Sequence, residues 1–331
     1  MAAEFALFDP WQAQYHQRWQ HLRDPDVRAL AWLLDSPDLF DAGWPQWQGQ
    51  VAHLLVRADL DAWLSALDLD PAPLKACVPA GMRLGRYAEK LMGFYLQQLG
   101  VLHAQGVPVR AARNDTIGEF DFLWRDGPLL VHWEFATKFY LYEASIGARD
   151  NGYFIGPNLA DSLDVKMGKI LQRQLALGQH PAAQAVLPQA IDRAQALVKG
   201  WLFYREAAVA ATGVPAGTGL SAQHCRGFWC ALHDAAALSA SVDEKYALLP
   251  RKQWLAPAAL DLDATPDAVL DKATLLPLLA AHFANDSMPL MLLCLRRVGG
   301  QWLEARRGFV VPDDWQQRAL QRYPAAAVPM L

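Results

Sequence analysis

The chain has 331 residues, of which 53% are apolar and 19% are charged. This composition excludes a disordered or fibrous protein, and the length suffices for two domains of roughly 150 residues each. The longest apolar run, 288–295, is shorter than the about 20 residues that a bilayer requires, so we expect no membrane association. The opening MAAEFALFDPW lacks the basic start of a secretory signal, which predicts a cytoplasmic location.

The net charge of −4 does not by itself indicate a nucleic-acid-binding protein. Four scattered cysteines favour a reducing compartment over a disulfide framework. Two of them, Cys225 and Cys230, lie near His224 and His233, which raises the alternative of a zinc site. The stretch reads as a strand, however, and positions 225 and 230 of a strand face opposite sides. We therefore favour buried packing thiols.

Residues 1–80 are predicted to form a helical N-terminal region. Apolar residues recur at helical spacing in 24–40 and again in 49–67. The proline-punctuated stretch 71–79 reads as a linker. A longer helix over 82–99 should follow, with Glu89 beside its apolar stripe. The simplest role for Glu89 is an ion pair with Arg86 or Lys90.

A β-hairpin is predicted around Asp126-Gly127, between strands at 117–125 and 129–142. With these two residues as the loop, Arg125 faces Pro128, and the bulky face of the first strand, including Phe120, lies in the core. The opposite face carries acids, and in this register Glu119 faces Glu134 of the second strand. A four-residue loop from Asp126 to Leu129 would instead place Asp121 directly opposite Glu134.

The acidic face has two interpretations. It is either the solvent-facing side of a half-buried hairpin, or a cation site, because like charges across strands are unfavourable. Carboxylate oxygens suit Mg²⁺, which can lower the pKa of bound water and stabilise charge on a phosphoryl oxygen. His132 lies on the same face and is a further candidate for a role there.

Several short sequence blocks resemble a known fold. They are GRYAE at 85–89, GEFD at 118–121, EFATKFYL at 134–141 and GPN at 156–158 with a lysine at 166. Their order is similar to that in the PD-(D/E)XK nuclease-like superfamily over residues 82–205. Most of the chain also resembles an uncharacterised bacterial family known only as a domain of unknown function. The nuclease resemblance implies a helix, a three-stranded meander, a crossover helix and a further strand over KGWLFYRE.

The same resemblance implies a catalytic site that hydrolyses phosphodiester bonds with Mg²⁺ or Mn²⁺. Its catalytic residues would be Asp121, Glu134, Lys138 and Glu89, with Asp121 and Glu134 as metal ligands. The acidic face of the hairpin adds Glu119 as a third candidate metal ligand. The Glu134–Lys138 spacing departs from the usual Glu-x-Lys pattern. Residues two apart on a strand are separated by about 7 Å and residues four apart by about 13 Å, so Lys138 keeps the correct face one step further away. A bulge, a long reach by Lys138 or a degenerate site would each account for it.

The predicted helix over 161–178 carries a basic face. Asn158 and Asp161 are candidate N-caps, and the nucleic-acid-binding candidates are Lys166, Lys169, Arg173 and, matching a glutamine of the superfamily, Gln174. The alternative is a solvated helix side whose lysines pair with Asp161 and Asp164.

The C-terminal part, 221–331, is predicted to be strand-rich, with a hairpin at Gly299-Gly300. We expect its arginines at 296, 297, 306 and 307 to be exposed charges that protect a sheet edge. The whole chain is therefore predicted to be an α/β protein. A restriction-endonuclease-like mixed sheet at 81–220 follows the helical region 1–80 and precedes the strand-rich region 221–331.

Two functions follow as hypotheses. The first is a divalent-metal-dependent nuclease with DNA or RNA as its partner. The second is a catalytically inactive nuclease-fold module that binds nucleic acid or a protein, as the stretched Glu134–Lys138 spacing and the acidic net charge would allow. A phosphoester hydrolase with a small substrate is a third class, without a motif of its own.

Overall fold

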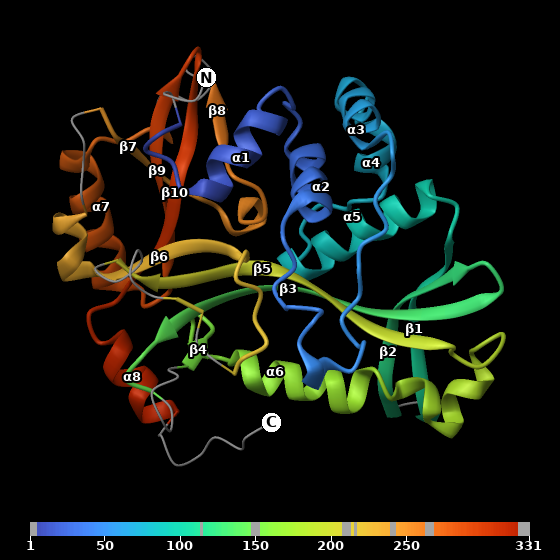
Figure 1. Cartoon of the computed structure of the whole chain (residues 1–331). Coiled ribbons are helices and arrows are strands. Elements are labelled where there is room, and N and C mark those ends of the chain that lie inside the picture. Colours follow the sequence, from blue (N-terminus) through green and yellow to red (C-terminus); the bar gives the residue numbers. More distant parts are fainter. Residues whose placement is uncertain are drawn as a thin grey trace.

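The computed structural model describes residues 5–112, 115–146, 153–206, 213–214, 217–238, 243–261 and 268–323. These residues form a mixed ten-stranded sheet with helices on both faces (Figure 1). The strand order is β1-β2-β3-β5-β6-β10-β9-β7, with β4 beside β3 and β8 beside β10. The predicted α/β class is confirmed, with N-terminal helices and C-terminal strands around a mixed sheet.

The strands are β1 (Leu102–Ala112), β2 (Asp115–Asp126), β3 (Leu129–Glu143), β4 (Tyr153–Ile155), β5 (Arg193–Arg205), β6 (Cys225–Ala231), β7 (Lys245–Leu248), β8 (Ala259–Asp261), β9 (Leu290–Val298) and β10 (Gln301–Val311). The helices are α1 (Pro10–Trp19), α2 (Pro25–Asp35), α3 (Leu60–Leu69), α4 (Ala72–Ala76), α5 (Leu84–Gln98), α6 (Leu163–Lys169), α7 (Lys272–Asn285) and α8 (Trp315–Arg322). A π-helical turn, η2 (Ile170–Gln174), continues α6.

The N-terminal region is helical only in part. The helix expected over 24–40 is α2, but the one expected over 49–67 begins only at Leu60. Before it, the Gln50 carbonyl accepts from the Ala196 amide at 2.7 Å, and the Ala52 amide donates to the Ala196 carbonyl at 2.9 Å. The segment is thus extended along β5, since pairing with the sheet outweighs its helical periodicity. The stretch expected to be a linker contains the short helix α4.

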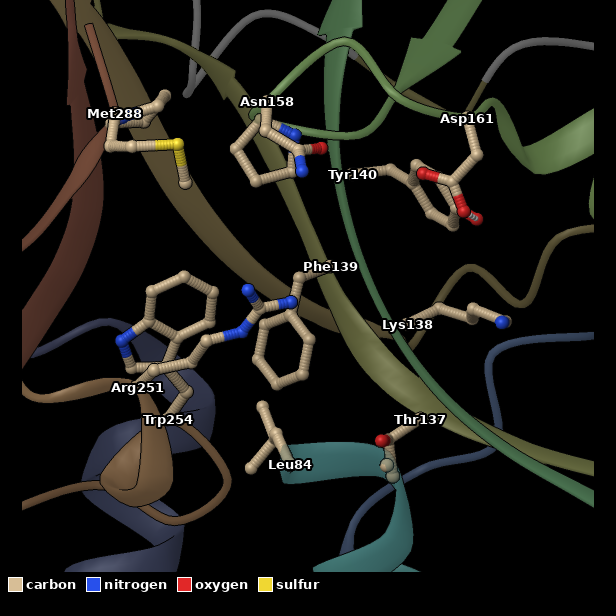
Figure 2. A pocket seen from close by; sticks show the side chains of 13 residues that line it. Leu84, Thr137, Lys138, Phe139, Tyr140, Asn158, Asp161, Arg251, Trp254 and Met288 are labelled. Carbon is tan, nitrogen blue, oxygen red and sulfur yellow. Dashed lines mark hydrogen bonds between the residues drawn. The ribbon is translucent and has the colours of Figure 1, made fainter. Parts of the chain in front are cut away.

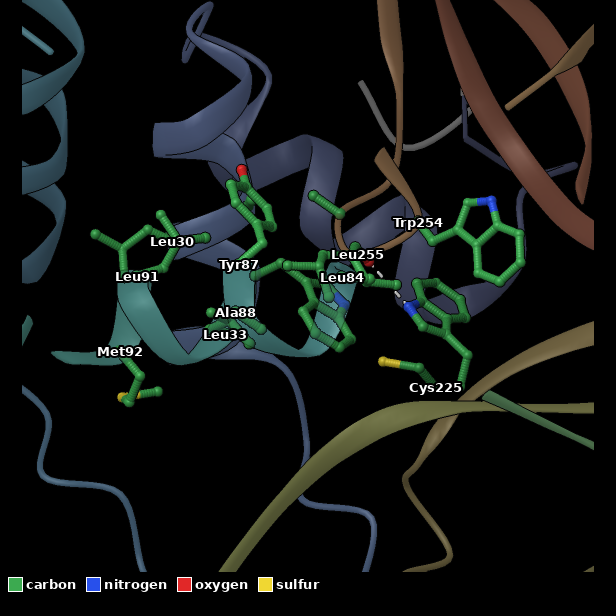
Figure 3. Packing of buried hydrophobic residues seen from close by; sticks show 14 of the residues in the cluster. Leu30, Leu33, Leu84, Tyr87, Ala88, Leu91, Met92, Cys225, Trp254 and Leu255 are labelled. Atoms are coloured by element: carbon green, nitrogen blue, oxygen red, sulfur yellow. Dashed lines mark hydrogen bonds between the residues drawn. The ribbon is translucent and has the colours of Figure 1, made fainter. Parts of the chain in front are cut away.

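Helix α5 packs its apolar side between α2 and the sheet, as its spacing predicts. Figure 3 shows Ala88 and Leu91 of α5 beside Leu30 and Leu33 of α2. Glu89 is only 8% exposed, so it lies at the border of this core and not in open solvent. The core thereby fixes the height of Glu89 above the sheet.

The β2–β3 hairpin adopts the second of the two predicted registers. Arg125 pairs with Leu130, not with Pro128, and Asp126 pairs with Leu129. The turn is therefore Gly127-Pro128, where Gly127 supplies a φ of +57° that other residues adopt at a cost. Extending this register puts Asp121 across from Glu134, so the expectation that Glu119 faces the glutamate is wrong.

Strand pairing between β2 and β3 stops at Phe122 and Trp133. Just beyond, the Asp121 carboxylate accepts the Phe135 amide at 2.9 Å. The Phe120 ring lies 4.9 Å from the His132 ring and belongs to a separate small core with Leu123. The prediction that Phe120 shares the core of the hairpin's bulky face is therefore wrong, because alternation breaks where the strands part.

The C-terminal strands continue the same sheet. β6 lies parallel to both β5 and β10, so β10 is an interior strand. Cys225 and Cys230 are buried in different cores, as expected for packing thiols on opposite faces. The hairpin at Gly299-Gly300 is confirmed between β9 and β10.

The expectation of edge arginines is wrong for two of them. Arg307 is fully buried and donates to both carboxylate oxygens of Glu304, at 2.6 and 2.8 Å. Arg306 pairs with Glu206 at 2.7 Å. Because β10 has neighbours on both sides, these charges lie among interior strands and need local partners.

Gly200 sets the closeness of β5 to β3. The two residues Gly200 and Lys138 are paired, and a Cβ at Gly200 would overlap the Lys138 carbonyl oxygen. We expect Gly200→Ala to lower the free energy of unfolding by about 1–3 kcal/mol through overpacking. Urea unfolding checks this, with Gly300→Ala as the control, because a Cβ there meets no atom within 4 Å. Equal stability of both variants would contradict this account of Gly200.

Candidate active site

The middle of β3 has an open edge. On one side β5 pairs with β3 throughout 131–141. On the other side β2 leaves after Trp133 and β4 joins only at Leu141, so no described strand pairs with 134–140 there. This gap places the side chains of β2, β3, the start of α5 and α6 around one notch in the sheet.

Three acids meet beside the notch. Glu89 comes from α5, and Glu119 and Asp121 come from β2; one carboxylate oxygen of each lies within 4.8 Å of the others. Arg86 occupies part of this cluster. Its guanidinium donates to Glu89 at 2.8 and 3.0 Å and to Glu119 at 2.9 and 3.2 Å. The predicted Arg86–Glu89 pair is therefore present, and it extends to a second carboxylate.

Asp121 and Glu134 are the two carboxylates that lack such a partner. Burial raises the pKa of Asp121 to about 7, and the charges of Glu89 and Glu119 add to the rise. Burial, and next the charge of Asp121, raise the pKa of Glu134 to about 8. Glu134 Oε1 accepts from Gln174 Nε2 at 3.2 Å, but its Oε2 is buried with no hydrogen-bond partner among the described residues. When both acids are ionised, the pair thus carries two negative charges with no direct ion pair to a lysine or arginine in the described part of the chain, and the charges of Arg86, Lys138 and Lys169 offset them only in part.

His132 lies beside the same carboxylate. It is fully buried, and neither ring nitrogen has a hydrogen-bond partner in the described part of the chain. Its Nε2 lies 4.0 Å from Glu134 Oε2. Burial lowers the pKa of His132 to about 4, so the ring is neutral at pH 7 and does not neutralise Glu134.

Lys138 is half-buried and lies on the same face of β3 as Glu134, four residues further along the strand. Burial lowers its pKa, and the nearby Lys166 charge lowers it further. The charges of Asp161, Glu134 and Asp121 act in the opposite direction. The amine is thus in electrostatic reach of both unpaired carboxylates despite the stretched spacing.

The predicted helix over 161–178 is shorter and broken. It begins at Leu163 with Ser162 as N-cap, so the N-cap roles expected for Asn158 and Asp161 are wrong. Asp161 instead accepts from the Tyr140 hydroxyl at 3.2 Å and pairs with Lys166 at 3.8 Å. The π-helical turn η2 then brings Gln174 to Glu134, and π-helical turns are frequent at functional sites.

The remaining basic candidates fall on the outer side of this helical segment. Lys169 and Arg173 are exposed, and neither has an ion pair within the described residues. Lys169 is also close enough for its charge to lower the pKa of Glu134. Lys169 is therefore available to an anionic ligand near Glu134, whereas Lys166 is partly engaged, and Arg173 is an exposed cation four residues further along the chain.

The donor set fits a divalent cation of the Mg²⁺ or Mn²⁺ type. Asp121 and Glu134 offer hard oxygen ligands without an ion-paired lysine or arginine among the described residues, and Glu134 Oε2 is an orphaned buried oxygen. Glu119 and Glu89 are already bound by Arg86, so they would serve a cation only by sharing that contact. The acids whose oxygens come within 4.8 Å of one another are Glu89, Glu119 and Asp121, and this group could hold a metal beside β2.

A pocket lies next to the notch, at the start of α5. The sequence did not predict this pocket. Its volume is about 210 Å³. One wall is apolar, with Leu84, Phe139 and Trp254, and the other is polar, with Asn158 and Lys138 (Figure 2). The wall residues come from four distant stretches of the chain, so no local pattern marks the pocket.

Fold and site together define an α/β protein with a partly buried acidic cluster at a gap in a mixed sheet. The chain belongs to the family described as domain of unknown function DUF1853, which matches residues 28–311. No curated protein and no solved structure matches the chain. None of the helices in the described part of the chain combines the length and apolar character that crossing a bilayer requires.

Proposed function

We propose that the protein is a divalent-metal-dependent nuclease that hydrolyses phosphodiester bonds in DNA or RNA. One observation carries the proposal: burial and mutual repulsion raise the pKa values of Asp121 and Glu134 at the open edge of β3, and neither has an ion pair with a lysine or arginine among the described residues. A cation bound between them would remove the repulsion that raises both pKa values, and exposed cations lie next to it for a phosphate.

The side chains have distinct tasks in this reaction. Asp121 and Glu134 hold Mg²⁺ or Mn²⁺, and Gln174 fixes the orientation of Glu134 through its hydrogen bond. A metal held by these residues would lower the pKa of a bound water and stabilise negative charge on the phosphoryl oxygens. Lys138 Nζ, whose pKa is lowered by burial, accepts a proton from the attacking water more readily than an exposed lysine. Lys169 and Arg173 hold the phosphate backbone.

The order of elements also supports the proposal. A helix (α5), an antiparallel meander (β1 to β3), a crossover with α6 and a parallel strand (β5) follow one another as the PD-(D/E)XK resemblance implies. Glu89, Asp121 and Glu134 fall on the elements that the resemblance assigns to them. The distinct features of this chain are Arg86 within the acids and a lysine four positions after the glutamate.

Cleavage of labelled oligonucleotides tests the proposal. We expect Mn²⁺- or Mg²⁺-dependent cleavage of a single-stranded or duplex DNA or RNA, absent in EDTA. Glu134→Gln should reduce the rate at least about 100-fold, because it weakens the metal and the charge stabilisation it provides. Asp115→Asn, an exposed acid on β2, is the matched control and should leave the rate unchanged.

Two outcomes would contradict the proposal. Cleavage that survives both Asp121→Asn and Glu134→Gln would show that this site is not responsible. Absence of cleavage with oligonucleotide binding that depends on Lys169 and Arg173 would instead favour the catalytically inactive module.

A further inference from the structure

We infer that the pocket beside the notch binds one unpaired nucleobase, so that the substrate is a single strand or a frayed strand end. The inference rests on the proposed function and deepens it by naming the form of nucleic acid. It is carried by four features of the pocket: its size, its aromatic wall, its unpaired backbone edge and its unpaired cation.

The size suits a single planar ring system. The cavity of about 210 Å³ is smaller than the roughly 300–1,000 Å³ typical of pockets for drug-sized ligands. A base pair or a stretch of duplex is too large for it. A base reaches it only after leaving its partner strand, which is least costly at an end or in a single strand.

The wall offers a stacking surface. The Phe139 and Trp254 rings lie 5.6 Å apart at an interplanar angle of 59°, and Phe139 remains partly exposed. Trp254 is held from behind by Phe309, at 5.0 Å, and its Nε1 donates to the Leu249 carbonyl at 3.0 Å. Rigidly held aromatic rings are sequence-tolerant platforms for bases, because every base has a π-face.

The open edge of β3 offers hydrogen bonds. The Phe135 amide points toward β2, where it meets Asp121, and Leu141 pairs with β4 on the same side. By the two-residue alternation of a strand, the amides and carbonyls of Thr137 and Phe139 point to that side as well. Both residues line the pocket. They thus present donors and acceptors in the plane where the edge of a stacked base would lie.

Arg251 provides the charge. It is exposed, and its guanidinium lies 5.5 Å from the Trp254 ring centre. No carboxylate among the described residues pairs with it. A cation at the rim of an aromatic pocket is suited to the phosphate of the nucleotide whose base enters. The Asn158 side chain on the opposite wall adds an amide that can contact the sugar or base (Figure 2).

The pocket and the acidic site share strand β3 and the start of α5. Lys138 belongs to the pocket lining and lies within the electrostatic reach of Asp121 and Glu134. Leu84 and Gly85 of the lining precede Arg86 on α5. With the phosphate of the bound nucleotide held at Arg251, the neighbouring phosphodiester of the strand extends past Lys138 toward the proposed metal, so the base selects the position of cleavage.

Binding of small probes in EDTA tests the pocket without any catalysis. Calorimetry would measure the affinity of the protein for adenosine 5′-monophosphate and for ribose 5-phosphate. We expect the nucleotide to bind at least about 10-fold more tightly, since the base adds stacking. Phe139→Leu should reduce this ratio toward one. Arg251→Gln should weaken both probes while keeping the ratio, and Lys252→Gln, a neighbouring exposed cation outside this pocket, should change neither. The deoxy form of the nucleotide separates an RNA preference from a DNA preference.

An oligonucleotide competition supplies the second measurement. A hairpin with a single-stranded tail should compete for adenosine 5′-monophosphate binding at least about 10-fold better than the same hairpin with a blunt end. Equal binding of the nucleotide and ribose 5-phosphate, or an unchanged ratio in Phe139→Leu, would overturn the inference. Base-dependent binding without metal-dependent cleavage would refute the proposed nuclease but leave the pocket standing.

Discussion

Replacing both unpaired carboxylates, by Asp121→Asn and Glu134→Gln, is expected to stabilise the metal-free protein at pH 8 and to abolish its stabilisation by Mn²⁺. Burial raises the pKa of each acid in the folded state, to about 7 and about 8, above the ordinary values near 4. The fold therefore tolerates the protonated acids best. Their favourable contribution to the free energy of unfolding is complete below about pH 4. It is lost as the pH rises through the pKa values that the two acids have in the folded protein.

The sizes of these effects follow from linkage. Each pKa unit corresponds to about 1.4 kcal/mol, so the double variant should exceed the wild type in unfolding free energy by about 2 kcal/mol or more at pH 8 in EDTA. At pH 4 the two proteins should be nearly equal. Mn²⁺ at 100 times its Kd should narrow the difference by about 2.7 kcal/mol, because the metal stabilises the wild type alone.

Urea unfolding at several pH values, with and without Mn²⁺, measures both effects. Asp115→Asn is the control for removing an acid from an exposed position of β2, and it should follow the wild type. If the double variant and the wild type have the same pH profile in EDTA, the two carboxylates are not the buried, mutually repelling pair described above.

Arg307→Met is expected to produce the largest loss of stability among single substitutions outside the site. Arg307 is fully buried, and it donates to Glu304, to the Trp254 carbonyl and, at 2.7 Å, to the Ala256 carbonyl. Its guanidinium also lies 4.2 Å from the Trp201 ring centre. The substitution leaves the Glu304 charge buried and unpaired, which costs about 3–5 kcal/mol.

Comparing Arg307→Met with the double variant Glu304→Gln/Arg307→Met separates the loss of stability caused by an unpaired charge from the loss caused by altered packing. The double variant has no unpaired buried charge and should recover part of the loss. Arg297→Met, at an exposed position of β9, should change the unfolding free energy by less than about 0.5 kcal/mol. Urea unfolding of the three variants measures these differences. A loss below about 1 kcal/mol in Arg307→Met would show that the buried pair does not hold the Trp254 segment in place.

The hairpin shows how far local sequence can determine a site. The alternation of apolar and polar residues, together with the turn signal Asp126-Gly127, correctly predicts the two strands and places Asp121 and Glu134 on one face. They do not decide between two registers of the same parity, because both keep the apolar residues on one face. The observed register depends on Gly127-Pro128 forming the turn, and the displaced position of Phe120 depends on where β2 and β3 separate.

Long-range pairing explains the other differences. The 49–58 segment has helical periodicity but bonds to Ala196, about 145 positions away in the chain, along β5. Arg307 looks like an edge charge because the hairpin alone does not reveal that β6 covers β10 on its other side. The pocket of Phe139, Trp254 and Arg251 likewise forms only when β3 meets the 251–254 turn.

Anomalous diffraction from Mn²⁺-soaked crystals, recorded on either side of the manganese absorption edge, would locate the metal relative to the two carboxylates. We expect a manganese peak within about 2.5 Å of a carboxylate oxygen of both Asp121 and Glu134. A peak held only by other residues, or carboxylates directed apart with no manganese between them, would contradict this expectation.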